Sequence, residues 1–356
     1  MNNETKTAQL KQLYGYKQQL RKSPQLRRLF LELTLRCNEN CLHCGSRCND
    51  VVSEELPLNV YYSFLDKIKH DFSGRLPMLC ITGGEPMLRK EFFDIVNYAH
   101  KLGFRWGMTS NATLITGEVT KKLKEAGMAT ISVSLDGLEE THDSFRRTRG
   151  GFKGAVEGIK NLMQGGFGNV QITTVVTKKS LPELESLFEL CRKLDVDSWR
   201  VIGIEPIGRA LELGELFLSR DEQFQMLDFI KRKRREGYPV TYGCSHYLGL
   251  DYEREVRDWY FLCNAGVYTA SIMANGDIAA CLDIERRSET IQGNILRDDF
   301  TKVWREGFKI YRTPLYTKNE ECRRCEHRDF CEGGSYHSWD YDKNEQMVCL
   351  LSAGAI

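Results

Sequence analysis

The chain has 356 residues, of which 41% are hydrophobic and 28% charged, and its formal net charge at pH 7 is +1. This length favours two domains over one, and the near-neutral charge gives no electrostatic reason to expect nucleic acid or an anionic membrane as a partner. No apolar run approaches the ~20 residues that span a bilayer, and residues 1–6 lack the apolar stretch of an export signal. We therefore expect a cytoplasmic protein.

The first 28 residues mix basic side chains with Gln and Leu, which predicts an amphipathic helical extension, residues 1–28, that covers the barrel-like part of the chain. From residue 29 to 236 short apolar runs alternate with longer amphipathic ones. Strands are expected at 29–36, 77–82, 104–109, 129–135, 169–177 and 198–205, and helices at 57–72, 90–103, 117–127, 152–165, 181–194 and 221–236. This alternation predicts an α/β fold with a parallel sheet and right-handed crossovers. Six units are fewer than the eight of a closed barrel.

Function in parallel α/β folds lies at the carboxyl ends of the strands, and chemically useful residues follow four of the expected strands. Cys37, Cys41 and Cys44 follow the first one in C-x3-C-x2-C spacing. Gly83-Gly84-Glu85-Pro86 follows the second, Ser110-Asn111 the third and Ser134-Leu135-Asp136 the fourth, and a basic stretch, Arg146-Arg147-Thr148-Arg149, comes next. Each segment alone also fits an ordinary turn, loop or solvated face. Their coincidence at successive strand ends indicates a site.

Thirteen cysteines are the anomaly of this composition. Most lie in two groups, near 37–48 and 244–349, and in a chain without an export signal they favour metal or cluster binding over disulfides. Thiolates as close in sequence as Cys37, Cys41 and Cys44 can all face one iron–sulfur cluster, whereas zinc normally takes four protein ligands. Three ligands leave one iron of a four-iron cluster open for chemistry.

The order of these motifs resembles the radical S-adenosylmethionine (SAM) enzymes over roughly residues 29–236. The resemblance implies a partial (β/α)6 TIM-like barrel with a 4Fe–4S cluster on Cys37, Cys41 and Cys44, whose open iron would be chelated by the amino and carboxylate groups of SAM. It further implies that Gly83, Gly84 and Glu85 meet the amino group, that Ser134 and Asp136 meet the ribose side, and that Arg146 meets the carboxylate. Pro86, Ser110 and Asn111 complete the implied cofactor-binding set.

The chemistry implied by this resemblance belongs to the cofactor, which the protein positions and shields from water. An electron from the cluster would cleave the sulfonium to methionine and a 5′-deoxyadenosyl radical, which would abstract hydrogen from an unactivated C–H bond. A flavodoxin- or ferredoxin-like partner would supply that electron. Two residues depart from the usual pattern. His43 stands where an aromatic ring is common. Cys48 is an additional thiol, and we do not favour it as a cluster ligand.

The second cysteine group, in residues 237–356, resembles the SPASM extension, which carries auxiliary 4Fe–4S clusters in enzymes that modify peptides and proteins. An Asn275-Gly276 turn predicts a hairpin that brings Cys263 and Cys281 onto approaching strands. By the resemblance, one complete four-cysteine site is formed by Cys322, Cys325, Cys331 and Cys349. The alternative for these four cysteines is a structural zinc site, because spacing alone does not separate zinc from iron.

The other auxiliary site departs from the family pattern. It keeps Cys263 and Cys281, with Cys244 as a third ligand, but Ser335 stands where the pattern has a cysteine. Three outcomes are open: Ser335 or another oxygen ligates, the cluster has an open iron that binds a substrate thiolate, or the cluster is absent. Asp283 and Glu285 are candidate acids for deprotonating a substrate, with plain solvent exposure as the alternative.

The leading hypothesis is a radical enzyme that installs a cross-link, epimerisation or oxidation in a ribosomally made peptide, with a separate peptide-recognition protein as a further partner. One alternative is an enzyme that acts on a small molecule or cofactor precursor of the tetrapyrrole or quinone type. Another is a non-catalytic iron–sulfur or zinc scaffold. Fold analogy alone does not choose between them, because one barrel hosts many chemistries.

Overall fold

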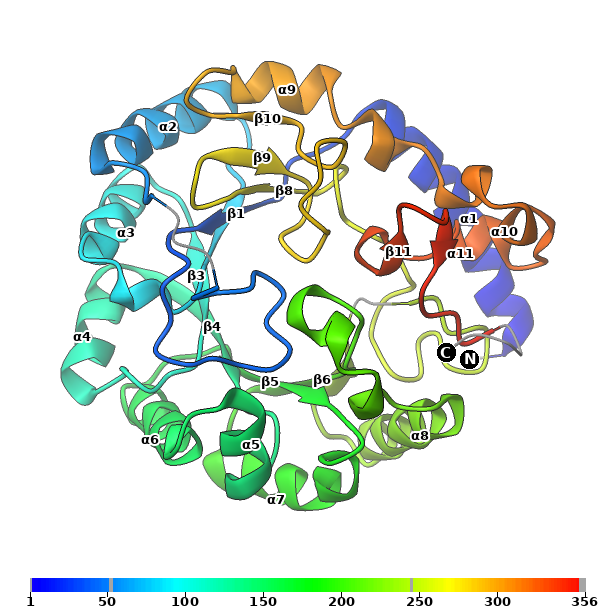
Figure 1. Ribbon diagram of the computed structural model, residues 1–356, viewed down its shortest axis with the longest axis horizontal. Helices are drawn as coiled ribbons and strands as arrows, with labels where there is room; N and C mark the ends of the chain where they lie inside the picture. The colour runs from blue at the N-terminus through cyan, green and yellow to red at the C-terminus, as the bar shows by residue number, and fades with distance from the viewer. Residues whose placement is uncertain (1, 51–53, 244–245, 352–356) are drawn as a thin grey trace.

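The computed structural model describes residues 2–50, 54–243 and 246–351. A curved sheet of ten strands runs through the molecule, in the order β10-β9-β8-β1-β2-β3-β4-β5-β6-β7 (Figure 1). Its central six strands are mutually parallel neighbours. They are β1 (Arg28–Glu32), β2 (Met78–Thr82), β3 (Trp106–Ser110), β4 (Met128–Ser134), β5 (Val170–Val176) and β6 (Ser198–Gly203). The expected α/β architecture with a parallel, TIM-like core is confirmed.

A ring of helices covers the outer face of these strands (Figure 1). They are α2 (Leu58–Asp71), α3 (Phe92–Lys101), α4 (Gly117–Glu125), α5 (Glu139–Arg146), α6 (Gly151–Gln164), α7 (Leu184–Leu194) and α8 (Arg220–Arg235). The 3-10 turns in this part are η1 (Pro86–Leu88), η2 (Leu181–Glu183), η3 (Gly208–Glu212) and η4 (Gly214–Leu216). Helix α7 shows why they dock: its residues 184, 187, 188, 191 and 194 are buried, a spacing that places them on one face.

The strands use their two faces differently. In β5 every second residue, from Val170 to Val176, is buried beneath the helices, and the residues between them are only partly buried. Side chains alternate between the faces of a strand, so these intervening residues point into the barrel. The interior is therefore lined by such side chains as Ser132, Thr173 and Arg200, which hydrogen-bond to one another across β4, β5 and β6.

The chain beyond Glu236 extends both edges of the same sheet. Strand β7 (Val240–Tyr242) pairs in parallel with β6, and β8 (Thr269–Ile272) pairs in parallel with β1. Strand β9 (Asp277–Ala279) returns antiparallel to β8 through a turn in which Gly276 has φ +89°, and β10 (Gly293–Asn294) follows it. The C-terminal third thus closes against the barrel through backbone pairing.

Helix α9 (Phe300–Glu306) lies beside α2, where the Phe300 ring contacts that of Phe64 (Figure 1). The remaining elements gather at one end of the molecule. They are η5 (Lys309–Arg312), η6 (Leu315–Lys318), α10 (Glu320–Arg324), α11 (Arg328–Cys331), η7 (Tyr336–Ser338), β11 (Trp339–Asp340) and β12 (Glu345–Gln346). Strands β11 and β12 form a separate two-stranded antiparallel sheet. Among the described residues, no helix combines the length and the apolar composition that crossing a bilayer requires.

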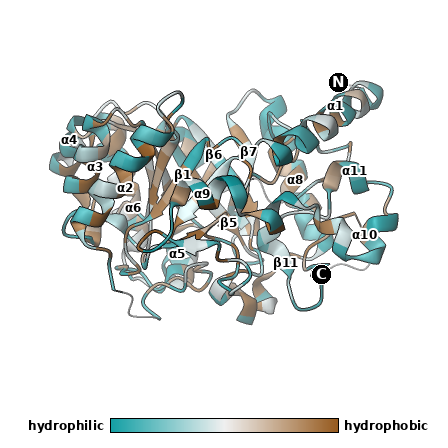
Figure 2. Ribbon diagram, turned by 90° about the horizontal axis from the view of Figure 1, so that it is seen from above, coloured by the Kyte–Doolittle hydropathy of each residue, from teal (hydrophilic) through white to brown (hydrophobic). Residues whose placement is uncertain are grey.

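The N-terminal helix α1 (Asn3–Lys22) lies against this C-terminal end and does not cover the six-stranded core. Leu10 packs with Tyr247 and Phe261, and Leu20 packs with Val267. Figure 2 shows α1 beside α10 and α11, at the end opposite α3 and α4. The expectation that this segment covers the barrel is corrected, because its apolar side chains find their partners in the cysteine-rich part of the chain.

Candidate active site

A cavity of about 400 Å³ opens at the carboxyl ends of the barrel strands. Half of the predicted site residues line it. They are Cys37, Cys41, Cys44, Gly83, Gly84, Ser110, Asn111, Ser134, Arg146 and Asp283. Glu85, Pro86 and Asp136 are buried directly behind this lining. Residues spread over 250 positions of sequence therefore meet in one place because parallel strands end at the same edge of the sheet.

The cysteine loop is tied to its surroundings along its whole length. The Asn49 side chain accepts the Cys37 N–H and donates to the Cys37 carbonyl oxygen, both over 3.0 Å. The backbone N–H of Leu42 donates to the carbonyl oxygen of Phe145 over 2.9 Å. His43, the residue that departs from the aromatic pattern, stacks on the Phe145 ring at 4.3 Å between centroids. The loop is thereby held against the end of α5.

A glycine of η3 allows the segment that follows β6 to pack closely against the cysteine loop. Gly208 has φ +57°, and a Cβ atom there would lie 2.3 Å from the Cys44 carbonyl oxygen. Gly84 is required for the same reason, since a Cβ atom there would lie 2.2 Å from the Arg36 carbonyl oxygen. The sequence predicted that Gly83 and Gly84 admit a ligand, but the contact that demands glycine at Gly84 is with the protein's own backbone.

The thiols of the loop differ in their acidity. Burial raises the pKa of Cys37 to about 11 and that of Cys41 to about 12, whereas a hydrogen bond from Cys48 lowers the pKa of Cys44. Because metal ligands are thiolates, cluster assembly on this loop must displace protons. Within the described ranges, no three His, Cys, Asp or Glu side chains close around one point as the ligands of a single ion do.

Glu85 is a fully buried carboxylate near the cysteines. Its Oε2 accepts from the Ser110 hydroxyl over 2.9 Å and from the Asn111 N–H over 3.0 Å, and burial raises its pKa to about 7. Pro86 begins η1 directly after it. A carboxylate that is fully desolvated and has no cation within its bonding shell among the described residues fits the ammonium group of a ligand.

The predicted ribose and carboxylate contacts form a buried ion cluster. Arg146 Nη2 lies 2.7 Å from Asp136 Oδ2, and Arg146 Nη1 lies 2.7 Å from Glu39 Oε2. Burial disfavours the charged form of Asp136, yet Arg146 holds the pKa of this carboxyl below its usual range. Sequence reasoning missed Glu39, although a carboxylate between the first two cluster cysteines was a visible signal.

Unsatisfied polar atoms around the cavity fit a polar ligand. Glu39 Oε1, His43 Nδ1 and Arg209 Nε are buried and make no hydrogen bond within the part of the chain that the structure describes, and all three residues line the cavity. Buried polar groups are nearly always paired. A ligand with amino, carboxylate and hydroxyl groups, as SAM has, suits such a lining.

The opposite wall comes from the strand-6 end and the C-terminal part. Glu205 accepts from His337 Nε2 over 2.9 Å, and His246 Nε2 lies 3.3 Å from its other oxygen. Burial disfavours the charged forms of Glu205 and His337. The two imidazoles nevertheless hold the pKa of Glu205 well below its usual value, and Glu205 raises the pKa of His337. Sequence reasoning assigned no role to Glu205, His246 or His337, because their partners are far apart in the chain.

The two candidate acids have different surroundings. Asp283 lines the cavity, and its Oδ1 lies beside Gly45 of the cysteine loop. Glu285 is largely exposed and pairs with Arg287 on the surface. The structure therefore keeps Asp283 as a candidate and places Glu285 outside the site.

The complete four-cysteine set is brought together at the far end of the molecule. Cys322 lies on α10 and Cys331 on α11, and the thiol of Cys349 lies within electrostatic reach of both. Cys325, in the turn between the two helices, is also an electrostatic neighbour of Cys322. These four residues fit the four-cysteine ligation of an iron–sulfur cluster.

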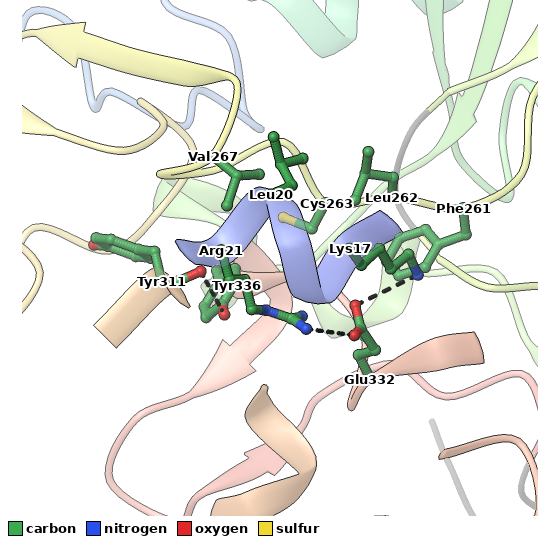
Figure 3. A pocket seen from close by; sticks show the side chains of 11 residues that line it. Lys17, Leu20, Arg21, Phe261, Leu262, Cys263, Val267, Tyr311, Glu332 and Tyr336 are labelled. Carbon is green, nitrogen blue, oxygen red and sulfur yellow. Dashed lines mark hydrogen bonds and ion pairs between the residues drawn. The ribbon is translucent and has the colours of Figure 1, made fainter. Parts of the chain in front are cut away.

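The space beside the second auxiliary set is much smaller than the cavity at the strand ends. The cavity beside Cys263 measures about 20 Å³ (Figure 3), which is room for about one water molecule. It is closed by Lys17 and Arg21 of α1, both paired with Glu332. The Ser335 hydroxyl is fully buried and bonded to the Ser338 hydroxyl over 2.6 Å, and Cys244 lies outside the described residues. The described surroundings of Cys263 do not fit a four-iron cluster.

Comparison with known proteins agrees with this geometry. Residues 31–191 match the profile of the radical SAM superfamily, and residues 263–326 match that of the SPASM iron-sulfur cluster-binding domain. An AdoMet-dependent heme synthase of Oleidesulfovibrio alaskensis is 30% identical over 87% of this chain and 83% of its own length. The mycofactocin maturase MftC of Mycolicibacterium smegmatis is 30% identical over 85% of this chain and 76% of its own.

The fold is similar to that of Streptococcus suis SuiB bound to S-adenosylmethionine, with a TM-score of 0.70 and 21% identity over 95% of this chain and 79% of SuiB. The chain belongs to the radical SAM superfamily and carries a SPASM domain. It is a radical SAM enzyme whose cofactors are 4Fe–4S clusters and SAM. The resemblance seen in the order of its motifs is thereby confirmed, while the names of its relatives divide between a heme synthase and a mycofactocin maturase.

Proposed function

We propose that this radical SAM enzyme acts on a ribosomally made peptide, from which it abstracts a hydrogen to install a cross-link, an epimerisation or an oxidation. The observation that carries the proposal is the cavity. Its volume of about 400 Å³ lies at the lower end of the ~300–1,000 Å³ typical of small-molecule sites, and SAM is itself a ligand of that size. The cluster and SAM together therefore take up most of the cavity, and the opening beside them suits at most one side chain of a longer substrate.

The lining supports the same reading. None of the described residues that line the cavity is Phe, Tyr or Trp, whereas a flat macrocycle is usually held between apolar and aromatic faces. A peptide requires only that its reacting residue enter, while its backbone stays at the mouth. The similarity to the maturase MftC, at 30% identity, agrees with this substrate class.

The cofactor site that we propose uses the predicted residues in these roles. Cys37, Cys41 and Cys44 hold the 4Fe–4S cluster, which together with SAM supplies the 5′-deoxyadenosyl radical. Glu85 receives the ammonium group of SAM, and Ser134 and Asp136 face its ribose. Ser110 and Asn111 orient Glu85 by the hydrogen bonds described above.

Arg146 and Asp283 complete the proposed site. Arg146 serves the SAM carboxylate while Glu39 and Asp136 fix its guanidinium. Asp283, on the wall formed by the C-terminal part, accepts a proton from the substrate. A flavodoxin- or ferredoxin-like protein supplies electrons, and a separate peptide-recognition protein is a further partner of this proposal.

The tail cluster that we propose is a single one, on Cys322, Cys325, Cys331 and Cys349. Cys263 and Cys281 are then structural residues, because the cavity beside Cys263 accommodates about one water molecule. The hypothesis of an open auxiliary iron that binds a substrate thiolate loses its support with this assignment.

A second candidate function is the modification of a carboxylate side chain on a tetrapyrrole. The observation in its favour is the AdoMet-dependent heme synthase, which is 30% identical and of which the chain covers 83%. In that case only the side chain enters the cavity and the macrocycle stays at its mouth.

The test measures 5′-deoxyadenosine formation by the anaerobically reconstituted chain with SAM and a chemical reductant. Candidate peptides encoded next to its gene are compared with an iron porphyrin that carries propionate side chains. We expect a peptide to stimulate SAM cleavage and to change in mass. Stimulation by the porphyrin alone, with a porphyrin product, would replace the proposal by the second candidate. No SAM cleavage under any condition would remove both.

A further inference from the structure

The loop that carries the cluster cysteines continues into a fourth cysteine that lies directly against one of them. The Cys48 thiol lies within hydrogen-bonding reach of the Cys44 sulfur, and the Cys48 backbone N–H donates to the same sulfur over 3.3 Å. Cys48 is 2% exposed and packs with Leu35 and Ala274. Its thiol is therefore kept out of bulk water and directed at a proposed ligand.

The backbone on both sides of Cys48 fixes this arrangement. Arg47 and Asn49 have φ of +49° and +69°, so the chain turns back on itself around Cys48. Asn49 then bonds to both backbone groups of Cys37, and Arg209 donates to the Cys48 carbonyl oxygen over 3.0 Å. These bonds connect Cys48 to the beginning of the cysteine loop and to η3.

The three loop sulfurs differ in what they receive. The Cys44 sulfur accepts from the Cys48 backbone N–H and lies within hydrogen-bonding reach of the Cys48 thiol and the Ser46 N–H. The Cys37 sulfur accepts from the Glu39 N–H over 3.5 Å, and the Cys41 thiol points at a carboxylate oxygen of Glu39. Cys44 is thus the sulfur around which hydrogen-bond donors concentrate.

Donors at a cluster sulfur change the reduction potential of the cluster. Reduction adds negative charge to the sulfurs, and a hydrogen bond is stronger to the more negative acceptor. A donor therefore stabilises the reduced state more than the oxidised state and raises the potential. Its removal makes the cluster harder to reduce.

We propose that Cys48 is a positioning residue that donates to the Cys44 sulfur and raises the reduction potential of the cluster on Cys37, Cys41 and Cys44. The inference rests on that proposed cluster. Cys48 is not a fourth ligand in this account, since its thiol faces a ligand sulfur and the fourth iron is left for SAM.

The experiment compares the full wild-type chain with Cys48→Ala, Cys48→Val and Cys48→Ser, all reconstituted anaerobically. Ala and Val remove the thiol donor, and Val also fills its space, while Ser keeps a donor. Cys80→Ala is the matched control, because Cys80 lies on β2 outside the cavity lining. Iron content is measured for every sample, and an EPR redox titration follows the cluster signal that changes on addition of SAM.

We expect all variants to keep the iron content of the wild type. The midpoint potential of Cys48→Ala and Cys48→Val becomes more negative, while Cys48→Ser and Cys80→Ala stay close to the wild type. Potentials of the Ala and Val variants equal to that of Cys80→Ala, with iron retained, overturn the inference and leave the cluster assignment standing. Loss of about 4 Fe in all three Cys48 variants makes Cys48 a ligand and overturns it too. A wild type without any SAM-responsive signal removes the proposed cofactor site itself.

Discussion

Two cysteine-lined regions of this chain differ in the space that the fold leaves beside them. At the strand ends, Cys37, Cys41 and Cys44 face a cavity of about 400 Å³, whereas Cys263 faces one of about 20 Å³. In the first region glycines allow the backbone segments to pack closely around the cysteine loop, and buried side chains bond to one another behind the lining. The second is filled by α1 and by the Lys17–Glu332 and Arg21–Glu332 ion pairs. Cysteine spacing predicts which thiols can meet, but the packing around them decides what they can hold.

The largest expected effect comes from displacing the cysteine loop beside the open region. Gly208→Ala places a Cβ atom 2.3 Å from the Cys44 carbonyl oxygen and adds strain at φ +57°, so the cysteine loop must shift. We expect the variant to lose the iron of one cluster, about 4 Fe per chain. Gly214→Ala, with nothing within 4 Å of the added atom, is the control and keeps its iron. Full iron in Gly208→Ala would show that the loop does not depend on this contact.

A smaller effect is expected from the carboxylate behind the open region. Glu85→Gln removes the proposed acceptor of the SAM ammonium group, and losing one partner of such a buried pair costs about 2 kcal/mol or more, a factor of about 30 in affinity. Anaerobic equilibrium dialysis with labelled SAM measures it, with Glu91→Gln as the control outside the cavity lining. An unchanged affinity in Glu85→Gln would contradict the assignment.

The same carboxylate predicts a pH dependence. Burial raises the pKa of Glu85 to about 7, so the free site is partly protonated at neutral pH, and binding an ammonium requires the ionised form. SAM affinity should therefore rise with pH up to about 8 and then level, and the rise should vanish in Glu85→Gln. A wild-type affinity that is flat between pH 6 and 8 would argue against this role.

The ion cluster of Glu205, His246 and His337 in the cavity wall is expected to affect stability. Glu205→Gln leaves His337 and His246 without their anion, and breaking a buried ion pair costs about 3 kcal/mol. The folded pKa of Glu205 is depressed, so its contribution is present above the unfolded pKa of about 4.3 and is lost as pH falls through the folded value. The raised pKa of His337 acts oppositely, with stability lost as pH rises through it.

Urea unfolding at several pH values measures how much this ion cluster contributes to the free energy of unfolding, with Glu285→Gln, at an exposed position, as the control. Glu205→Gln should be less stable near pH 6 and should lose the acid-side slope that Glu205 causes in the wild type. Equal unfolding free energies for Glu205→Gln and Glu285→Gln at all pH values would show that the ion cluster contributes no net stability.

The smallest effect is expected in the closed region. Lys17→Met removes a buried cation but keeps a side chain of similar length, while Arg21 still pairs with Glu332 over 2.6 Å. Replacing a buried charge by an apolar side chain of similar volume is often nearly neutral, so we expect a change within about 1 kcal/mol and no change in iron content. A change of about 4 Fe would contradict this expectation, through a cluster beside Cys263 or through the tail cluster, whose proposed ligand Cys331 also lies close to Lys17.

The sequence predicted the open region well because its signals are local. The cysteine triplet, the Gly-Gly-Glu-Pro turn and the Ser134–Asp136 segment each follow a strand, and parallel strands bring their carboxyl ends together. Sequence reasoning missed Glu205 and His337 because nothing in their neighbours identifies a partner, and it passed over Glu39 although this carboxylate stands between two cluster cysteines. His337 reaches Glu205 across 132 positions of sequence.

The closed region shows the opposite case. The spacing of Cys263 and Cys281 predicted two ligands, but the space beside Cys263 depends on α1, which lies more than 240 positions earlier in the chain. The amphipathic pattern of that helix indicated that it packs on a surface, and we wrongly expected that surface to be the barrel. Lys17 and Arg21, for which the sequence indicated no partner, line the cavity beside Cys263.

The most direct test of the contrast between the two regions is the anaerobic iron and sulfide content of the wild type beside the Cys37→Ala/Cys41→Ala/Cys44→Ala triple variant. With four irons per cluster, we predict about 8 Fe in the wild type and about 4 in the variant, one cluster in the open region and one in the tail. About 12 Fe falling to about 8 would contradict the account, because the region beside Cys263 would then hold a cluster. Zinc in place of iron in the variant would contradict the tail assignment.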